Sequence, residues 1–237
     1  MNYIFDVDGT LTPSRLSIDD EFERFFLGWI KDKDVYLLTG SDMHKTIEQV
    51  GEDIWKSVTK SYQSAGNVVY SNGVLESKSD FKVGDDLTAL LYIFLETSKW
   101  SEKYSNHIEQ RTGLLNFSTI GRGCTQEARE RYYEWDNKEK EREGFCEKIM
   151  NRFPELEASV GGQISIDIHL KGKNKSQVLD FIKGDVSFFG DKCKPGGNDY
   201  SIVERLQREG VEKRNYKIYD VLDWKETYKI LRGLKKQ

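Results

Sequence analysis

The chain has 237 residues, of which 37% are hydrophobic and 32% are charged, and its formal net charge is −4. This composition is typical of a globular protein with one large domain or two modest ones, and the negative charge argues against a nucleic-acid or anionic-membrane partner. The three cysteines are odd in number and lack Cys-x-x-Cys spacing, which argues against a zinc site and favours a reducing compartment. Because the sequence also contains no signal segment and no apolar run of membrane-spanning length, we expect a cytoplasmic protein.

Residues 3–12 are the most informative stretch of the chain. Tyr3–Phe5 is predicted to form a short buried strand, and it leads into two acids, Asp6 and Asp8, with Gly9 permitting a tight turn. Two carboxylates at the tip of a buried strand are costly unless a metal ion or a lysine lies beside them. The carboxyl ends of strands are also where open α/β sheets bind ligands. The plain alternative is a strand followed by an acidic turn.

A strand–helix alternation follows. Apolar residues at helical spacing predict one helix over residues 18–31 and another over residues 43–54, with a strand at Val35–Leu38 between them. This order predicts a right-handed parallel sheet. Thr39 then lies at a second strand tip, where a hydroxyl and free helix-start amides suit a phosphate.

The pattern changes between residues 67 and 172. We expect hairpins at residues 67–76 and 107–120, and strands at residues 156–160 and 163–170. The helices expected in this region cover residues 87–100, 125–135 and 136–153. We interpret the charged run at residues 136–143 as a solvated helix face without function. Strands joined by hairpins indicate an antiparallel sheet, and hence an inserted α+β domain.

After residue 172 the α/β pattern returns. It predicts helices over residues 176–182, 199–209 and 223–234, and strands at residues 186–189 and 217–221. The expected fold is therefore α/β: a Rossmann-like parallel-sheet core with an inserted α+β cap domain that contains an antiparallel sheet. The core is assigned to residues 1–80 and 173–237, and the cap to residues 81–172.

The motifs at the predicted strand tips resemble a known superfamily. Asp-Val-Asp-Gly-Thr at residues 6–10, Thr39, Lys175 and Gly-Asp at 190–191, with Asn-Asp at 198–199, are similar to the haloacid dehalogenase superfamily of phosphoryl-transfer enzymes. Longer segments, at residues 6–13, 113–122, 161–167, 188–192 and 195–199, resemble the eukaryotic-type phosphomannomutase family. The likeness covers nearly the whole chain, and the cap segments make it specific, because the core motifs suit many phosphatases.

The resemblance implies an intramolecular phosphotransferase. Such an enzyme interconverts D-mannose 6-phosphate and α-D-mannose 1-phosphate through an aspartyl-phosphate and a hexose 1,6-bisphosphate, which also serves as activator. A carboxylate that attacks phosphorus splits one transfer into two, which suits Asp6, and Asp8 is placed to exchange a proton with the sugar oxygen. The family likeness further implies Mg²⁺, a homodimer formed through the cap, a cap that closes to exclude water, and a role in GDP-mannose biosynthesis.

The implied site residues fall into four groups. The Mg²⁺ ligands are Asp6, Asp8 and Asp191, with Asn198 and Asp199 supporting. Phosphate is held in the core by Thr39 and Lys175. The sugar phosphate is bound by Arg15, Arg111, Arg122, Arg129, Ser165 and Asp167, because the planar fork of arginine suits a second phosphate. Any single arginine or lysine of this set is equally compatible with a solvated side chain.

Some segments depart from the family pattern. Gln-Ser-Ala-Gly at residues 63–66 replaces Pro-Glu-Asn-Gly, Thr-Gly-Ser-Asp at 39–42 replaces Gly-Gly-Ser-Asp, and Gln-Arg-Thr-Gly at 110–113 replaces Phe-Arg-Asn-Gly. No proposed catalytic group is lost. The alternatives that remain open are a sugar-phosphate phosphatase of the same superfamily, a catalytically silent binding protein, and a preference for glucose over mannose phosphates.

Overall fold

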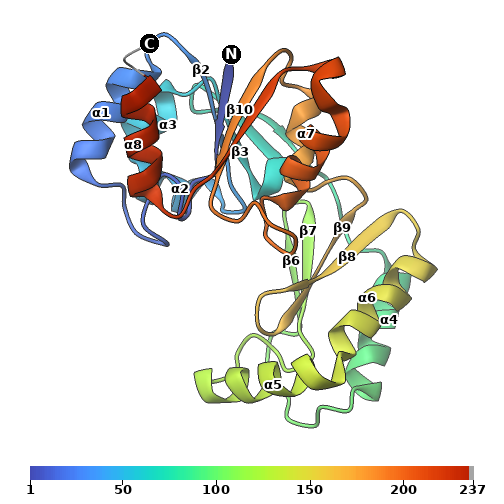
Figure 1. The fold of residues 1–237 in the computed structure, drawn as a ribbon. Helices are drawn as coiled ribbons and strands as arrows, with labels where there is room; N and C mark the ends of the chain where they lie inside the picture. The colour runs from blue at the N-terminus through green and yellow to red at the C-terminus, as the bar shows by residue number, and fades with distance from the viewer. Residues whose placement is uncertain (235–237) are drawn as a thin grey trace. The chain divides into compact units, whose positions relative to one another are not determined.

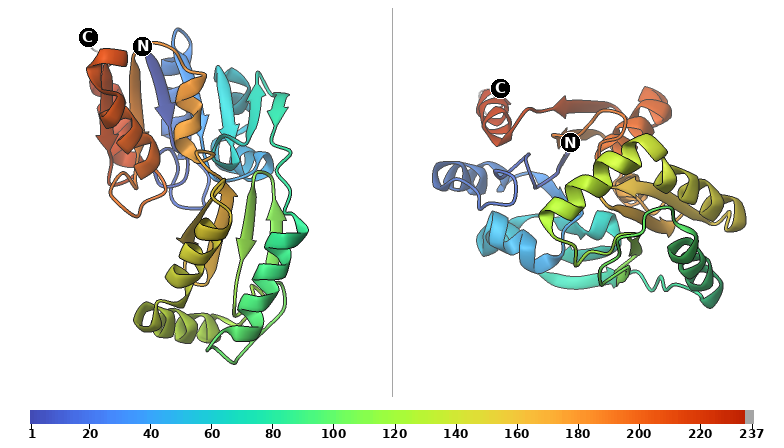
Figure 2. Two further views of the ribbon diagram at one scale, coloured as in Figure 1. Left: turned by 90° about the vertical axis from the view of Figure 1, so that its right-hand side faces the viewer. Right: turned by 90° about the horizontal axis from the view of Figure 1, so that it is seen from below.

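The computed structural model describes residues 1–234 and divides into two compact units (Figures 1 and 2). The core unit comprises Met1–Lys78 and the segment that starts at Lys173, and the cap unit comprises Ser79–Gly172. The core domain assigned from the sequence also includes residues 235–237, which lie outside the described residues. Within the described part of the chain, no helix is both long and apolar enough to span a membrane.

A seven-stranded sheet forms the centre of the core unit, in the order β11-β10-β1-β2-β3-β4-β5. Neighbouring strands from β11 to β3 run parallel, whereas β4 and β5 form an antiparallel hairpin at one edge. Phe5 at the end of β1 pairs with Phe189 of β10 and Leu37 of β2, so the carboxyl ends of these three strands meet at one edge. The strands are β1 (Asn2–Phe5), β2 (Asp34–Leu38), β3 (Lys60–Gln63), β4 (Val68–Ser71), β5 (Val74–Lys78), β10 (Val186–Gly190) and β11 (Tyr216–Asp220).

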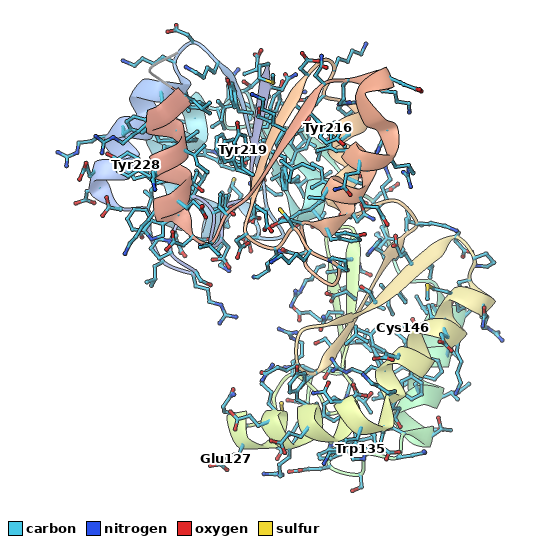
Figure 3. All side chains as sticks on the ribbon, in the orientation of Figure 1. Glu127, Trp135, Cys146, Tyr216, Tyr219 and Tyr228 are labelled. Carbon is cyan, nitrogen blue, oxygen red and sulfur yellow. The ribbon has the colours of Figure 1, made fainter. Side chains whose placement is uncertain are left out.

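Helices cover both faces of this sheet (Figure 1). One apolar cluster joins the sheet to α1 (Asp20–Ile30), α2 (Met43–Val50), α3 (Glu52–Ser57) and α8 (Trp224–Leu234). A second joins the other face to α7 (Tyr200–Lys213) and the 3₁₀ helix η2 (Lys175–Asp180). Aromatic stacking contributes on the first face, where Tyr219 lies 4.2 Å from Phe189 and Tyr228 lies 4.9 Å from Phe22 between ring centroids (Figure 3).

Two local features of the core differ from the sequence expectation. The single helix expected over residues 43–54 is two helices, because Gly51 takes a φ of 80° and ends α2. Strand β3 was not predicted, since Lys-Ser-Tyr-Gln has no apolar alternation. Its buried polar residues are satisfied internally: the side chain of Gln63 hydrogen-bonds those of Ser61 and Thr46. A 3₁₀ turn, η1 (Ser64–Gly66), follows it.

The cap unit is built on a four-stranded antiparallel sheet in the order β6-β7-β9-β8. Its strands are β6 (Ile108–Arg111), β7 (Leu114–Phe117), β8 (Leu156–Gly161) and β9 (Ser165–Leu170), and its helices are α4 (Asp85–Thr97), α5 (Gln126–Glu139) and α6 (Glu141–Arg152). Helices α4 and α6 pack on the face that carries Leu115, Phe117, Ile166 and Ile168, and Cys146 lies in this layer (Figure 3). The parallel-sheet core with a separate antiparallel sheet confirms the predicted fold class.

The interpretation of residues 136–143 as a solvated face holds for most of the run and is wrong for two of its residues. Asp136 and Arg142 are only 3% and 1% exposed, and they form an ion pair of 2.7 Å between Oδ2 and Nε. The boundary between the two helices lies at Lys140, which takes a left-handed conformation, rather than at residue 135. A run of charged residues in the sequence does not reveal which two of them form a buried ion pair in the folded protein.

Candidate active site

The first acid of the opening motif is buried at the tip of β1, in contact with a lysine. The Asp6 amide donates to Phe189 O, which continues the pairing with β10 and fixes the backbone at the sheet edge. Lys175 Nζ lies 2.5 Å from Asp6 Oδ1 and 2.6 Å from Asp199 Oδ1, and all three side chains are buried. Thr10 Oγ1 donates to the other Asp6 oxygen at 3.3 Å. Asp6 thus has the cation that a buried carboxylate requires.

A third acid completes this group. Asp6, Asp191 and Asp199 each offer a carboxylate oxygen, and these oxygens all lie within 4.8 Å of one another. Asp191 Oδ1 is buried without a hydrogen-bond partner among the described residues. The backbone of Gly9 approaches so closely, at a φ of 94°, that a Cβ there would lie 2.6 Å from Asp191 Oδ2. One lysine facing three acids leaves an excess of negative charge that suits a cation.

Burial and the neighbouring charges shift the pKa values of Asp6, Asp191 and Lys175. Burial raises the pKa of the Asp6 carboxyl to about 7, with Lys175 opposing the rise and the two neighbouring acids adding to it. Burial also raises the pKa of Asp191. For Lys175, burial would lower the pKa of the ammonium group, but the Asp6 and Asp199 carboxylates outweigh burial and raise it. Lys175 is therefore charged at neutral pH.

Asp8 has a different environment, which separates it from Asp6. Its Oδ1 accepts hydrogen bonds from the Arg15 backbone N–H at 2.5 Å and from Gln49 Nε2 at 3.0 Å. Burial tends to raise the pKa of Asp8, but these hydrogen bonds outweigh it and hold the pKa below its usual range. Gln49 was missed in the sequence, where it is one polar residue on a helix; it also donates to Thr12 Oγ1 at 3.1 Å.

The side chains of three other predicted core residues form no hydrogen bond with Asp6, Lys175 or Asp199. Thr39 directly follows β2 and is buried, and its hydroxyl accepts from the Ser41 N–H at 3.1 Å. Asn198 is exposed in the turn before Asp199. Arg15 is exposed at a φ of 63°, and it contacts Asp8 through its backbone N–H.

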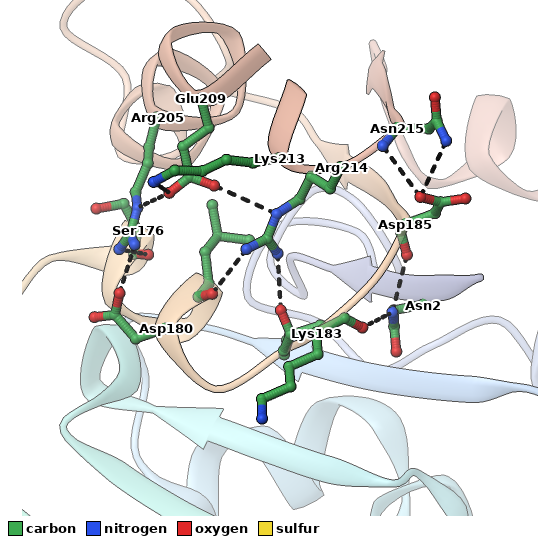
Figure 4. Close-up of polar contacts among 12 residues, drawn as sticks. Asn2, Ser176, Asp180, Lys183, Asp185, Arg205, Glu209, Lys213, Arg214 and Asn215 are labelled. Atoms are coloured by element: carbon green, nitrogen blue, oxygen red, sulfur yellow. Dashed lines mark hydrogen bonds and ion pairs between the residues drawn. The ribbon is translucent and has the colours of Figure 1, made fainter. Parts of the chain in front are cut away.

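Arginines of α7 and of the residue that follows it hold η2, the element that begins with Lys175; we call these contacts the clamp (Figure 4). Arg205 donates from Nη1 to Ser176 O at 2.9 Å and from Nη2 to Asp180 Oδ1 at 2.5 Å. Arg214, just after α7, donates to two further carbonyls, Leu179 O and Ile182 O. Glu209 lies between the two guanidinium groups, 2.9 Å from Arg205 Nε and 3.3 Å from Arg214 Nε. These contacts fix η2 against α7.

In the cap unit, polar side chains form a row across the sheet. Glu109 of β6 is opposite Asn116 of β7, which is opposite Asp167 of β9. Asn116 Nδ2 donates to Asp167 Oδ1 at 2.6 Å. Because neighbours in the strands point to opposite faces, this row lies on the face away from α4 and α6.

Two predicted arginines converge on this row. Glu109 accepts from Arg111 Nε and Nη2 at 3.0 and 2.8 Å, and its Oε2 lies 2.9 Å from Arg122 Nε. Arg122 Nη1 donates to Asn116 Oδ1 at 3.0 Å and to Ser165 Oγ at 3.3 Å. The Arg111 hydrogen bonds hold the pKa of Glu109 below its usual range. A single carboxylate therefore holds two arginines together, as a bound phosphate could.

Four predicted cap residues are connected here, Arg111, Arg122, Ser165 and Asp167. The fifth, Arg129, is half-buried on α5, and its side chain forms no hydrogen bond or ion pair with the described residues. Glu109 and Asn116 were missed, although a signal existed. Asn116 is a polar residue within the apolar run of β7, just as Asp167 is a polar residue between two isoleucines in β9. In both strands the alternation places the polar side chain on the face opposite the apolar ones.

Comparison with known proteins assigns the chain to a family. The family model for eukaryotic phosphomannomutase matches residues 23–219. The chain is 35% identical to a phosphomannomutase of Encephalitozoon cuniculi over 227 residues, covering 90% of this chain and 88% of that one. It is 37% identical to phosphomannomutase 1 of Homo sapiens over 213 residues, covering 84% and 81%.

Solved structures show the same fold at low sequence identity. A trehalose-6-phosphate phosphatase from Aspergillus fumigatus matches with a TM-score of 0.66 and 16% identity, over 99% of this chain and 92% of that chain. A haloacid dehalogenase-like hydrolase from Bacteroides thetaiotaomicron matches with a TM-score of 0.61 and 12% identity, over 98% of each chain. With the family model matching residues 23–219 and relatives 35–37% identical over more than four fifths of its length, the chain belongs to the eukaryotic phosphomannomutase family.

Proposed function

We propose that this protein is a phosphomannomutase that interconverts D-mannose 6-phosphate and α-D-mannose 1-phosphate, with Asp6 as the nucleophile. The observation that carries the proposal is the combination of a buried strand-tip Asp6 held by Lys175 with a second unit that presents two convergent arginines. A phosphatase needs only the first feature. A mutase must also hold the non-reacting phosphate of a sugar bisphosphate, and paired arginines suit that task.

The proposed cycle has two transfers. The Asp6 carboxylate is first phosphorylated, and the aspartyl-phosphate gives its phosphoryl group to the free hydroxyl of a sugar monophosphate, which yields a hexose 1,6-bisphosphate. After the bisphosphate reorients, Asp6 takes the other phosphoryl group and releases the isomer. Asp8 removes the proton from the attacking hydroxyl and returns it to the leaving sugar oxygen. Its lowered pKa keeps it in the base form that the first of these roles requires at neutral pH.

The residues around the transferring group supply electrostatic stabilisation. Lys175 is the charged donor beside Asp6, and α7 holds it rigidly through η2. We assign Thr39 to the phosphoryl oxygens as well, because it directly follows β2, the strand next to β1. Preorganised donors of this kind typically contribute 10²–10³ in kcat, roughly 3–4 kcal/mol each.

The acidic group fits a hard divalent cation, and we propose Mg²⁺. The oxygens of Asp6 and Asp191 converge, and the unpartnered Asp191 Oδ1 is an available ligand. The residues that would hold the ion are Asp6, the backbone carbonyl of Asp8 and Asp191. Asp199 would support these ligands by positioning Lys175. Asn198 would support them from the adjacent turn. Bound there, Mg²⁺ would offset the repulsion between the carboxylates and a phosphate.

In the cap unit we assign Arg111, Arg122 and Arg129 to the non-reacting phosphate, and Ser165 and Asp167 to the sugar hydroxyls. Arg15 is assigned to the substrate from the core side. The core residues and the cap residues belong to different units of the chain. The hexose 1,6-bisphosphate also serves as activator, since it rephosphorylates Asp6 after a bisphosphate is lost.

The enzyme is proposed to be cytoplasmic, to form a homodimer through the cap and to supply GDP-mannose biosynthesis. The three cysteines are free, which is consistent with a cytoplasmic enzyme, and mannose 1-phosphate would supply GDP-mannose biosynthesis. A homodimer through the cap is supported by α4, where Tyr92 and Ile93 are 57% and 51% exposed.

The test is a mutase assay on both hexose 1-phosphates. The protein is incubated with Mg²⁺, catalytic hexose 1,6-bisphosphate and either mannose 1-phosphate or glucose 1-phosphate, and products are followed by ³¹P NMR. We expect mannose 6-phosphate to form with little inorganic phosphate. Stoichiometric phosphate release without an isomer would instead identify a sugar-phosphate phosphatase, and faster turnover of the glucose substrate would change the assigned substrate.

A further inference from the structure

A buried ion pair in the cap unit lies outside the residues assigned so far. Asp136, near the end of α5, and Arg142, in the first turn of α6, are both almost fully buried. Asp136 Oδ2 accepts from Arg142 Nε at 2.7 Å, and its Oδ1 accepts from the Arg142 backbone N–H at 3.0 Å. The guanidinium also lies 5.8 Å from the centroid of the Tyr132 ring. Asp136 therefore satisfies one side of Arg142 and fixes its direction.

The other side of Arg142 reaches the turn between β8 and β9. Nη1 donates to two backbone carbonyls, Gly162 O and Ser165 O, each at 3.1 Å. These carbonyls lie at either end of a four-residue segment, so one nitrogen ties the two ends together. Ser118 Oγ holds the middle of the segment by donating to Ile164 O at 2.9 Å.

This turn sets the positions of two residues that we assign to the sugar. Ser165 is the last residue of the tied segment, and its Oγ accepts from Arg122. Asp167 packs directly on the turn, because a Cβ on Gly161 would lie 2.5 Å from Asp167 Oδ2. A shift of the turn would therefore move Ser165 and Asp167. It would also move Arg122, which is hydrogen-bonded to Ser165.

Stability alone gives a weak reason for such a pair. Burying two charges costs desolvation energy, and replacing a buried ion pair with apolar residues of similar volume is often neutral or stabilising. The contacts that apolar residues cannot reproduce are the two hydrogen bonds to the turn.

We propose that Arg142, oriented by Asp136, is a positioning residue for the sugar-phosphate site: it holds the Gly161–Ser165 turn so that Ser165 and Asp167 are preorganised. The inference deepens the proposed function and rests on it for the identity of the ligand. It assigns no contact between Arg142 and the substrate.

The experiment measures the binding of mannose 6-phosphate to the full chain by isothermal titration calorimetry, with KM for mannose 1-phosphate as a second readout. Arg142→Lys keeps the charge beside Asp136 but replaces the fork with a single nitrogen. The double variant Asp136→Leu/Arg142→Met removes both charges, because removing one partner would leave the other charge buried and unpaired. Arg131→Met is the control, since Arg131 forms an exposed ion pair with Glu102 in the cap unit and no hydrogen bond or ion pair with the turn.

We expect both Arg142 variants to bind the sugar phosphate roughly tenfold more weakly or worse, because small misplacements of binding groups have effects of that size. KM should rise more than kcat falls, and the control should match the wild type. Wild-type affinity in a folded Arg142→Lys variant would overturn the proposal, as would wild-type affinity in a folded double variant. If the double variant fails to fold, Arg142→Lys decides alone.

A double-mutant cycle with Ser165→Ala separates positioning from general loosening. If Arg142 acts through Ser165, Arg142→Lys should weaken binding far less in the Ser165→Ala background than in the wild type. Additive effects would contradict the mechanism. Because binding is measured directly, a wild type that binds mannose 6-phosphate without isomerising it would refute the proposed function and leave this inference standing.

Discussion

Lys175→Met is expected to destabilise the protein strongly at neutral pH and only slightly in acid. The substitution removes the ammonium group that lies 2.5 Å from Asp6 and 2.6 Å from Asp199, and it leaves an apolar side chain in a buried position. Removing one partner of a buried ion pair typically costs about 3–5 kcal/mol, because the remaining charge stays buried without compensation. Since domains are stable by only about 5–15 kcal/mol, this loss is easily measured.

The pH dependence follows from the titration of Asp6. Its pKa is near 3.8 in the unfolded chain and is raised to about 7 in the folded protein. Between these values the folded state binds the proton that the unfolded state has released, so Asp6 lowers the stability progressively as pH rises from about 4 to about 7. Lys175 opposes this rise in pKa. Without Lys175 the pKa of Asp6 is higher still, so the loss of folding stability continues to higher pH. The variant and the wild type should therefore differ least below pH 4 and most above pH 7.

The assay is urea unfolding without divalent metal, at pH values below, within and above this window. Lys192→Met is the matched control: the Lys192 side chain is 54% exposed, and its Nζ lies 3.9 Å from Asp191. Because the Lys192 ammonium group is largely in solvent and nearly 4 Å from the carboxylate, this pair contributes only about 0–1 kcal/mol. Turnover of mannose 1-phosphate should fall roughly 10²–10³-fold in Lys175→Met if Lys175 also stabilises the transferring phosphoryl group.

Added Mg²⁺ provides an independent check on the same charges. A cation that binds only the folded protein stabilises it by mass action, so Mg²⁺ should raise the unfolding free energy more above pH 7 than at acidic pH. The reasoning is refuted if Lys175→Met is as stable as the wild type at neutral pH. It is also refuted if the loss is the same at every pH, because a packing defect rather than buried charge would then explain it.

Three further variants test the site from other directions. Glu109→Gln removes the negative charge shared by Arg111 and Arg122, so inorganic phosphate should bind several-fold more tightly, as measured by calorimetry. Weaker binding would mean that Glu109 mainly orients the two arginines. Arg205→Met removes the hydrogen bond to Ser176 O and takes one partner from the buried Glu209 carboxylate, which should cost about 1–3 kcal/mol in urea unfolding and lower turnover by displacing Lys175. Wild-type kcat would restrict the clamp to a structural role. Gly9→Ala places a methyl group 2.6 Å from Asp191 Oδ2, so the Mg²⁺ concentration for half-maximal activity should rise about tenfold or more; an unchanged Mg²⁺ dependence would contradict the assigned ligand.

Much of the core site was predictable from sequence because parallel strands end at a common edge. Asp6, Asp191 and Asp199 each follow a predicted strand or begin a predicted helix, and the fold brings their carboxylates together. Lys175 is less obvious, since it begins a short 3₁₀ helix far along the chain. The family resemblance, rather than periodicity, singled it out.

The residues that were missed act through partners that a linear pattern does not reveal. Gln49 is one polar residue in an amphipathic helix until the fold places its amide against Asp8. Asp136 and Arg142 appear as part of an exposed charged run until α5 ends at Glu139 and brings them together inside the cap. Buried polar groups depend on tertiary pairing, whereas strand tips and apolar faces depend on local order and spacing.

The most direct test of the account is the location of the phosphoryl group during turnover. Wild type, Asp6→Asn and Asp8→Asn are mixed with hexose 1,6-bisphosphate and Mg²⁺, quenched rapidly in acid, and digested for peptide mass spectrometry. The account predicts a phosphoryl group on Asp6 in the wild type, none in Asp6→Asn together with loss of isomerase activity, and a phosphoryl group on Asp6 that turns over slowly in Asp8→Asn. Mannose phosphate isomerisation at the wild-type rate by Asp6→Asn, or a phosphoryl group on another residue, would contradict it.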